Sequence, residues 1–151
     1  MVYLYTDGSS RGNPGPGGFG TILKYGQHEK IISEGYKLTT NNRMELMAVI
    51  RGLEALTRGP MDVLVVSDSK YVVESVEKKW VFNWQKKGFK DKKNKDLWIQ
   101  FLEVNKRHNV RFKWIKGHAG HIENERCDQL AVNAATQPNL KEDFGYLESI
   151  R

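Results

Sequence analysis

The pattern of apolar residues changes once along the chain, and this change restricts the folds that the sequence can adopt. Three apolar-rich runs come first, Val2–Thr6, Phe19–Tyr25 and Lys30–Tyr36, and they are separated by the segments GNPGPGG and YGQHE. Short runs bounded by turn residues predict sequential strands that pair antiparallel. From Met44 to Leu56 the apolar residues recur instead at helical spacing, and Gly59-Pro60 ends that pattern.

The rest of the sequence adds strands that follow helices. Val63–Val66 and Val110–Ile115 predict two further strands. Helices are expected at Tyr71–Val81, Leu97–Arg107 and Asn124–Ala135. Because each later strand follows a helical crossover, we expect both to run parallel to the first strand. The sequence therefore predicts a mixed α/β fold, with a five-stranded mixed sheet, its first three strands antiparallel, and helices on both faces.

The length of 151 residues suits one domain. We expect this domain to span residues 1–135 and residues 136–151 to form a polar tail that is partly disordered. Cys127 is the single cysteine, so no intrachain disulfide can form. The N-terminus does not resemble a signal peptide, and no apolar run approaches the ~20 residues that span a bilayer. A cytoplasmic protein without a membrane segment is expected.

The positive charge is concentrated in one stretch. Of the net charge of +6, the stretch Lys86–Lys95 supplies +5, because it holds six lysines and only Asp91 opposes them. A basic patch on a nearly neutral body indicates a polyanionic partner. The alternative is a solvated lysine-rich loop. Trp80 and Trp98 flank this stretch, and we expect both to pack in the core beneath it.

Two carboxylates follow strands that are predicted to be parallel. Asp7 comes after the first strand and precedes Gly8-Ser9-Ser10, and Asp68 comes after the fourth strand. Parallel strands bring both side chains to the same end of the sheet. Like charges at close range repel unless a cation lies between them. Hard oxygen ligands favour Mg²⁺ or Mn²⁺.

Each acidic residue also has a structural interpretation. Asp68 is suited to cap the helix that follows it, and Asp7 is suited to a turn. Glu45 has the spacing from Asn42 that is typical of a capping box. Asp128 would then be an exposed residue on the last helix. The surroundings favour a ligand instead, because amide, guanidinium and glycine-rich backbone groups lie beside the acids and suit a phosphate backbone.

The loop Lys116–His121 carries two histidines. His118 and His121, followed by Cys127, could indicate a zinc site, but Cys127 and Asp128 are helical neighbours that point in different directions. A histidine flanked by glycines in a loop is better suited to proton transfer near neutral pH.

Six segments together resemble the type 1 ribonuclease H family, in particular the bacterial ribonucleases HI. The matching segments are YTDGSSRGNPGPGGFG, TTNNRMELMAVIRGLEAL, VSDSKYV, KKWVFNW, DLW and WIKGHAGHIENERCDQLA. The resemblance implies the same five-stranded mixed sheet. It also implies endonucleolytic hydrolysis of the RNA strand of RNA–DNA hybrids, with 5′-phosphate and 3′-hydroxyl products.

The resemblance also implies roles for single residues. The metal ligands would be Asp7, Glu45, Asp68 and Asp128, and His118 rather than His121 would be the catalytic histidine. The hybrid near the cut would be contacted by Gly12, Asn13, Asn41 and Asn42. The DNA strand would be faced by Tyr71 and Trp84, and one of its phosphates would be held by Thr40 and Asn94. A basic protrusion would be formed by Lys86, Lys87, Lys90, Lys92 and Lys93. The implied cofactor is Mg²⁺, with Mn²⁺ as a substitute and two ions when substrate is bound.

Three positions depart from relatives: Lys70 replaces a glutamine, Phe89 replaces a tryptophan, and Leu38 stands where some relatives have a basic residue. A monomer without an obligate protein partner is expected. Three alternatives stay open at this point: an integrase or junction resolvase on the same fold, a hybrid-binding module without catalysis, and a zinc-stabilised interaction domain.

Overall fold

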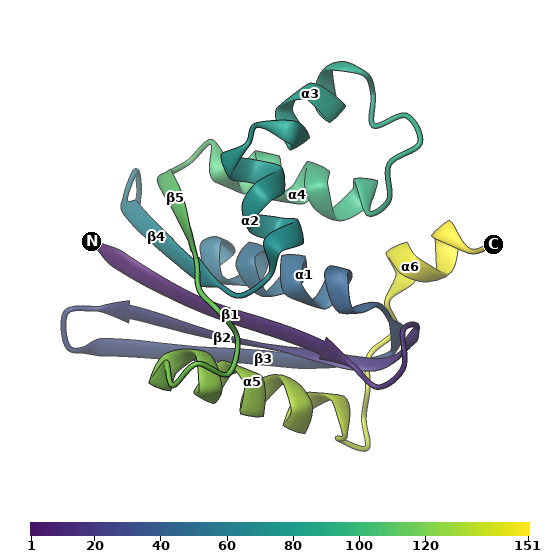
Figure 1. Ribbon diagram of the computed structural model, residues 1–151, viewed down its shortest axis with the longest axis horizontal. Coiled ribbons are helices and arrows are strands. Elements are labelled where there is room, and N and C mark those ends of the chain that lie inside the picture. Colours follow the sequence, from purple (N-terminus) through teal and green to yellow (C-terminus); the bar gives the residue numbers. More distant parts are fainter.

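A five-stranded sheet forms the centre of the structure, a computed structural model that describes residues 1–151 (Figure 1). The strands are β1 (Val2–Ser10), β2 (Gly15–Tyr25), β3 (His28–Thr39), β4 (Asp62–Ser67) and β5 (Asn109–Trp114). Their order is β3-β2-β1-β4-β5; β1, β2 and β3 pair antiparallel, and β4 and β5 run parallel to β1. The predicted mixed sheet is confirmed. β1 is longer than predicted, so Asp7 lies within it, opposite Gly20.

Helices cover both faces of the sheet, as predicted. They are α1 (Asn41–Glu54), α2 (Lys70–Glu77), α3 (Trp80–Lys86), α4 (Lys95–Asn105), α5 (Ile122–Ala135) and α6 (Phe144–Ser149). Figure 1 shows α1 against one face, with α2, α3 and α4 beyond it, and α5 against the other. The main core lies under α1 and α4, where Leu4, Ile50 and Phe101 are fully buried. No helix combines the length and the apolar character needed to cross a membrane.

Small residues let α5 pack closely on β2. A Cβ atom at Gly18 would lie 2.5 Å from the Ala131 carbonyl oxygen, and one at Gly20 would overlap the backbone of Cys127. The glycine-rich start of β2 is therefore required by the close approach of a helix as well as by a turn. This packing holds the middle of α5, including Asp128, against the centre of the sheet.

The helix predicted over Tyr71–Val81 is two helices, because the chain turns at Lys79. Lys79 has a left-handed backbone with φ of 65°, which ends α2 and redirects α3. Val81 is thereby fully buried, whereas Trp80 stays 42% exposed with the Lys78 ammonium 5.3 Å from its ring. The prediction that Trp80 lies in the core is wrong. Trp98 is fully buried, as predicted.

The segment 136–151, predicted to be a partly disordered tail, makes specific contacts in the structure. Lys141 exchanges backbone hydrogen bonds with β3, donating to Gly35 and accepting from Lys37. Asp143 is buried and accepts from the Thr39 hydroxyl at 2.7 Å. Helix α6 follows, and the Asp143 carboxylate caps its first turn.

Arg43 explains why the segment packs there. Its side chain is almost fully buried in α1, and a buried guanidinium needs several acceptors. Asp96 contacts it at 2.7 Å and Asp143 at 2.8 Å, so carboxylates from α4 and from the C-terminal segment both pair with it.

Replacing Asp143 with alanine should lower the free energy of unfolding by roughly 3 kcal/mol, because the buried Arg43 loses one of its two carboxylates. Urea denaturation at neutral pH measures the change. Glu29→Ala is the control, since it removes the partner of Arg126 in a surface pair, and it should cost less than about 1 kcal/mol. Equal losses in the two variants would contradict this account of the tail.

Candidate active site

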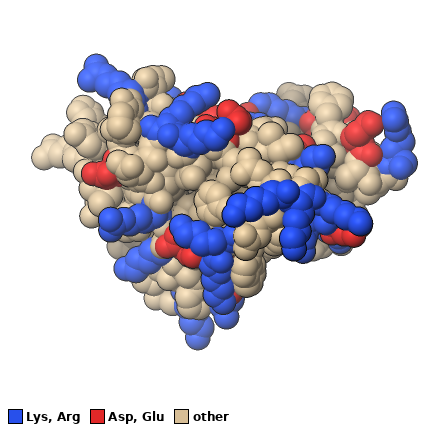
Figure 2. All heavy atoms as spheres, turned by 90° about the horizontal axis from the view of Figure 1, so that it is seen from above, with Lys and Arg blue, Asp and Glu red and all other residues tan.

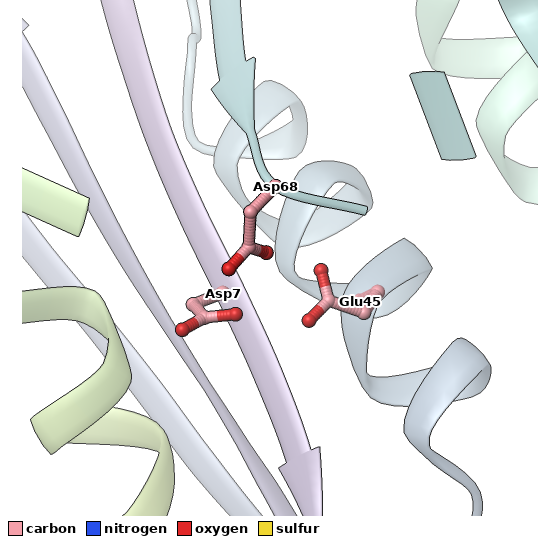
Figure 3. Close-up of side chains that lie close together, drawn as sticks. All are labelled: Asp7, Glu45 and Asp68. Atoms are coloured by element: carbon pink, nitrogen blue, oxygen red, sulfur yellow. The ribbon is translucent and has the colours of Figure 1, made fainter. Parts of the chain in front are cut away.

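Three carboxylates converge where β1, β4 and α1 meet. Asp7 lies on β1, Asp68 directly follows β4, and Glu45 lies in the second turn of α1. Figure 3 shows the three side chains pointing toward one another, and one oxygen of each lies within 4.8 Å of the others. Asp7 and Asp68 meet because their strands are adjacent and parallel.

Gly8 places Glu45 against Asp7. The Gly8 amide donates to Glu45 Oε1 and to Asp7 Oδ1, both at 2.9 Å. Any side chain at Gly8 would overlap the backbone of Met44, so α1 can cross β1 this closely only at a glycine. One backbone amide therefore orients two of the three carboxylates.

The helix caps are made by other residues, which leaves the carboxylates free. The N-cap of α1 is Thr40, whose hydroxyl accepts from the Arg43 amide, so the capping box expected for Asn42 and Glu45 does not form. The N-cap of α2 is Ser69, which accepts from the Val72 amide. The structural interpretations of Glu45 and Asp68 as caps are wrong.

Burial makes this cluster electrostatically unfavourable without a ligand. Burial, with the charges of Asp68 and Asp128 adding to it, raises the pKa of Asp7 to about 7. Burial and the neighbouring Asp7 raise the pKa of Glu45 well above its ordinary value, and burial raises the pKa of Asp68 as well. Glu45 Oε2 is buried and has no hydrogen-bond partner. A buried oxygen without a donor, beside two more carboxylates, fits a divalent cation.

Asp128 and His118 line the same cavity, which has a volume of about 390 Å³. Asp128 comes from α5 and is half-buried; its oxygens are not part of the 4.8 Å cluster, but its charge contributes to the raised pKa of Asp7. His118 lies in the exposed loop after β5, in a left-handed conformation with φ of 56°. Its proximity to Asp68 offsets part of the rise in the pKa of Asp68 that burial causes.

The histidines and Cys127 do not form a metal site. The group of potential metal ligands is made of carboxylates alone. Cys127 is fully buried and its pKa is raised by that burial, which opposes the thiolate that zinc needs. The zinc interpretation is therefore not supported.

Trp114 contacts the backbone of Asp68 beside the acidic cavity, a contact that the sequence motifs do not indicate. Its indole nitrogen donates to the Asp68 carbonyl at 3.0 Å, and the Lys70 ammonium lies 5.1 Å from its ring. Lys70 itself lines the cavity. Trp114 is the first residue of the segment WIKGHAGH, but its contact with Asp68 crosses from β5 to β4.

A larger groove of about 860 Å³ lies beside the acidic cavity, and Asn42 borders both. Thr40 and Asn13 lie on one side of it, with Asn13 Oδ1 accepting from the Asn41 amide at 3.1 Å. Asn94 lies on another side, and its amide nitrogen donates to the Tyr71 hydroxyl. Residues of α6, and Ile150 directly after it, also line the groove.

Lysines gather on the face around this groove. Figure 2 shows Lys and Arg side chains spread across the face seen from above, where they cover more of the surface than the Asp and Glu side chains between them. The lysines that the resemblance assigns to the basic protrusion are all exposed: Lys86, Lys87, Lys90, Lys92 and Lys93. The Lys92 ammonium lies 5.0 Å from the ring of Trp84, which is half-buried. Gly12 lies in an exposed turn with φ of 81°.

Known proteins share both the sequence and the fold. A model of the RNase H family matches residues 1–136. Relatives named Ribonuclease H, from Erwinia tasmaniensis, and Ribonuclease HI, from Pasteurella multocida, are 55% and 53% identical, over 97% of this chain and 96% of each relative. The crystal structure of LC9-RNase H1, a type 1 RNase H, matches with a TM-score of 0.81 and 32% identity, over 99% of this chain and 81% of that one.

A further solved structure includes a nucleic acid. LC11-RNase H1, in complex with an RNA/DNA hybrid, matches with a TM-score of 0.69 and 29% identity, over 89% of this chain and 96% of that one. Since the family model covers most of the chain, and relatives more than half identical to it cover nearly all of it, the chain belongs to the RNase H family.

Proposed function

We propose that this chain is an endonuclease that hydrolyses the RNA strand of RNA–DNA hybrids and leaves 5′-phosphate and 3′-hydroxyl ends. The observation that carries the proposal is the buried cluster of Asp7, Glu45 and Asp68, in a chain of the RNase H family. The name that the relatives bear and the hybrid bound to LC11-RNase H1 support the substrate.

The RNase H family depends on divalent metal ions, and the acidic cluster could bind one. We assign Asp7, Glu45 and Asp68 as the ligands, with Asp128 completing the set from α5. Mg²⁺ fits these hard oxygen ligands, Mn²⁺ is a plausible substitute, and two ions are proposed when the hybrid is bound. When bound, the cations would lower the pKa of the attacking water and stabilise charge on the phosphate.

Side chains of the protein would supply the proton that the reaction needs. In hydrolysis the water oxygen bonds to phosphorus, the bond from phosphorus to the 3′ oxygen breaks, and that oxygen takes up a proton. The exposed His118 imidazole would hold or pass such a proton, and its position in the lining of the acidic cavity supports this role. Its loop is outside the helices and strands, which suits a group that must follow the departing product.

Two surfaces would tell the strands apart. Near the acidic cavity, the backbone around Gly12 and the side chains of Asn13, Asn41 and Asn42 can meet the ribose 2′-hydroxyl with donors and acceptors. Thr40 and Asn94, which line the large groove, would hold a DNA phosphate. The rings of Trp84 and of Tyr71, which lines the acidic cavity, would lie against the DNA sugars. Neither surface reads base edges, so little sequence preference is expected.

The lysines of the basic patch (Lys86, Lys87, Lys90, Lys92 and Lys93) would hold the duplex through its phosphates. The acidic cavity repels phosphate, so attraction must come from outside it. Cytoplasmic location and a monomeric state stay predictions.

The Asp7→Asn variant tests the assignment. The unchanged chain with Mg²⁺ should cut labelled RNA–DNA hybrid and leave duplex DNA, duplex RNA and a four-way junction uncut. The cleavage rate of Asp7→Asn should fall by at least roughly a hundredfold, because the carboxylate becomes a neutral amide with one oxygen fewer to bind a cation. It should still bind hybrid and should fold, since it removes a buried charge rather than a contact in the core.

Glu123→Gln is a control for this experiment, because Glu123 lies on α5 in a surface pair with Lys24, away from the cavity. It should cleave normally. Near-normal turnover by Asp7→Asn would refute the metal assignment, and cleavage of the junction but not the hybrid would refute the substrate.

Binding of Mg²⁺ should release protons at pH 6 to 7. The pKa of Asp7 is raised to about 7, so between pH 6 and 7 the cluster carries protons that a cation must displace.

The raised pKa of Asp7 also affects stability. The native state binds more protons than the unfolded state between about pH 4 and 7, so Asp7 makes the metal-free protein less stable as the pH rises through that range. The number of protons released on Mg²⁺ binding is measured by calorimetry in two buffers of different ionisation enthalpy, and it should be much smaller at pH 9.

The same titration with Asp7→Asn should release fewer protons. Proton release that is identical at pH 6 and pH 9 would contradict the raised pKa.

Neutralising Lys90, Lys92 and Lys93 together by glutamine should weaken hybrid binding and flatten its salt dependence. The logarithmic slope should fall by up to roughly 0.9 for each phosphate that a lysine no longer neutralises. Binding is measured between low and physiological salt in the Asp7→Asn background, so that the hybrid stays intact. The matched control replaces Lys30, Lys106 and Lys113, which are exposed on other elements, and so removes the same charge. Equal salt slopes for the two triple variants would show that the basic patch is a solvated surface that does not bind the hybrid.

A further inference from the structure

Helix α6 forms one wall of the large groove. The groove borders Thr40 at the start of α1 and Asn94 before α4, and its remaining wall includes Tyr146 and Ile150 of the C-terminal segment. Ile99 of α4 joins that wall. We propose that these three apolar side chains form an additional contact surface for the sugar–phosphate backbone of the DNA strand. The proposal rests on the proposed function and extends its substrate surface to the C-terminus.

The wall is rigidly held, which a contact surface needs. The Asp143 carboxylate accepts from the Tyr146 amide at 3.2 Å and from two nitrogens of the buried Arg43 at 2.8 and 2.9 Å. Gly145 lies so close to Asp96 and Arg43 that a side chain there would collide with both. The same buried guanidinium reaches Asn94 Oδ1 at 3.4 Å. Arg43 therefore ties the α6 wall to the proposed phosphate pocket.

The apolar side chains are exposed where a core would bury them. Ile99 is 43% exposed and Ile150 is 56% exposed, although they come from elements far apart in the sequence. Single exposed apolar residues need no explanation, but here two elements contribute them to one hollow. They leave apolar surface that a ligand could cover.

The charges around the wall favour a polyanion. Lys92, Lys93 and Lys95 border the groove. They outnumber its two acidic residues, which are themselves paired: Asp96 lies 2.7 Å from Arg43, and Glu148 lies 3.1 Å from Arg151. An apolar wall beside free lysines fits a chain that alternates phosphates with sugar faces.

The chemistry selects the DNA strand. A deoxyribose can lie against Ile99 or Ile150 without losing a hydrogen bond, whereas a ribose 2′-hydroxyl there would be desolvated without a partner. The wall also continues from Thr40 and Asn94, which we assign to a DNA phosphate. The occupant is therefore a neighbouring nucleotide of the same DNA strand.

The test is the double variant Tyr146→Ala/Ile150→Ala. Its dissociation constant for hybrid, measured by fluorescence anisotropy in the Asp7→Asn background, should rise about three- to tenfold because the wall buries less apolar surface against the sugars. In the otherwise unchanged enzyme, KM should rise while kcat changes less than twofold. When ribonucleotides replace the DNA strand, the difference between the variant and its parent should fall below twofold.

Phe144→Ala is the matched control. Phe144 is 75% exposed on the same helix but does not line the groove, so its dissociation constant should stay unchanged. An unchanged constant for the double variant, an equal loss in Phe144→Ala, or the same penalty on a duplex without deoxyribose would each overturn the inference while leaving the proposed function intact. Failure of the unchanged enzyme to bind or cut hybrid would instead overturn the proposed function.

Discussion

Three carboxylates within 4.8 Å of one another, two of them buried and Asp68 half-buried, are the feature on which the rest of the structure depends. Burial, and to a lesser degree mutual repulsion, raises the pKa of Asp7 and Glu45, so the fold holds the carboxylates together at a cost in stability. Adjacent parallel strands place Asp7 and Asp68, and the absence of a side chain at Gly8 lets α1 bring Glu45 within reach. The cluster is thus prearranged for a cation, which would remove the repulsion.

A second buried charged side chain on the same helix, Arg43, has partners within the chain, unlike Glu45. Arg43, two residues before Glu45, is satisfied by Asp96 and Asp143, so it stabilises the fold and leaves nothing for a ligand. Glu45 Oε2, in contrast, has no partner within the chain. Of two buried ionic groups on one helix, the unsatisfied one marks the site and the satisfied one joins α1, α4 and α6 around the groove.

The surrounding charges complement this arrangement. A phosphate backbone is repelled by the acidic cavity and attracted by the lysines beside it, so the duplex would be held by the basic patch and the groove while a single phosphate approaches the acids. In the proposed function, different elements therefore carry the two tasks. The duplex would be attracted by α3, the turn after it and α4, and the chemistry would take place at β1, β4 and α1.

The sequence alone determined the strands, most helices and the mixed sheet, because apolar periodicity and turn residues are local signals. Its motifs also indicated the acidic residues. Local signals misplaced the cap of α1, where Thr40 acts instead of Asn42, and missed the left-handed turn at Lys79, since a lysine carries no turn signal. The contacts of the C-terminal segment were decided only in three dimensions. Asp143 is polar in a polar stretch, and its partner Arg43 lies 100 residues earlier, so only the fold brings that buried charge and its carboxylate together.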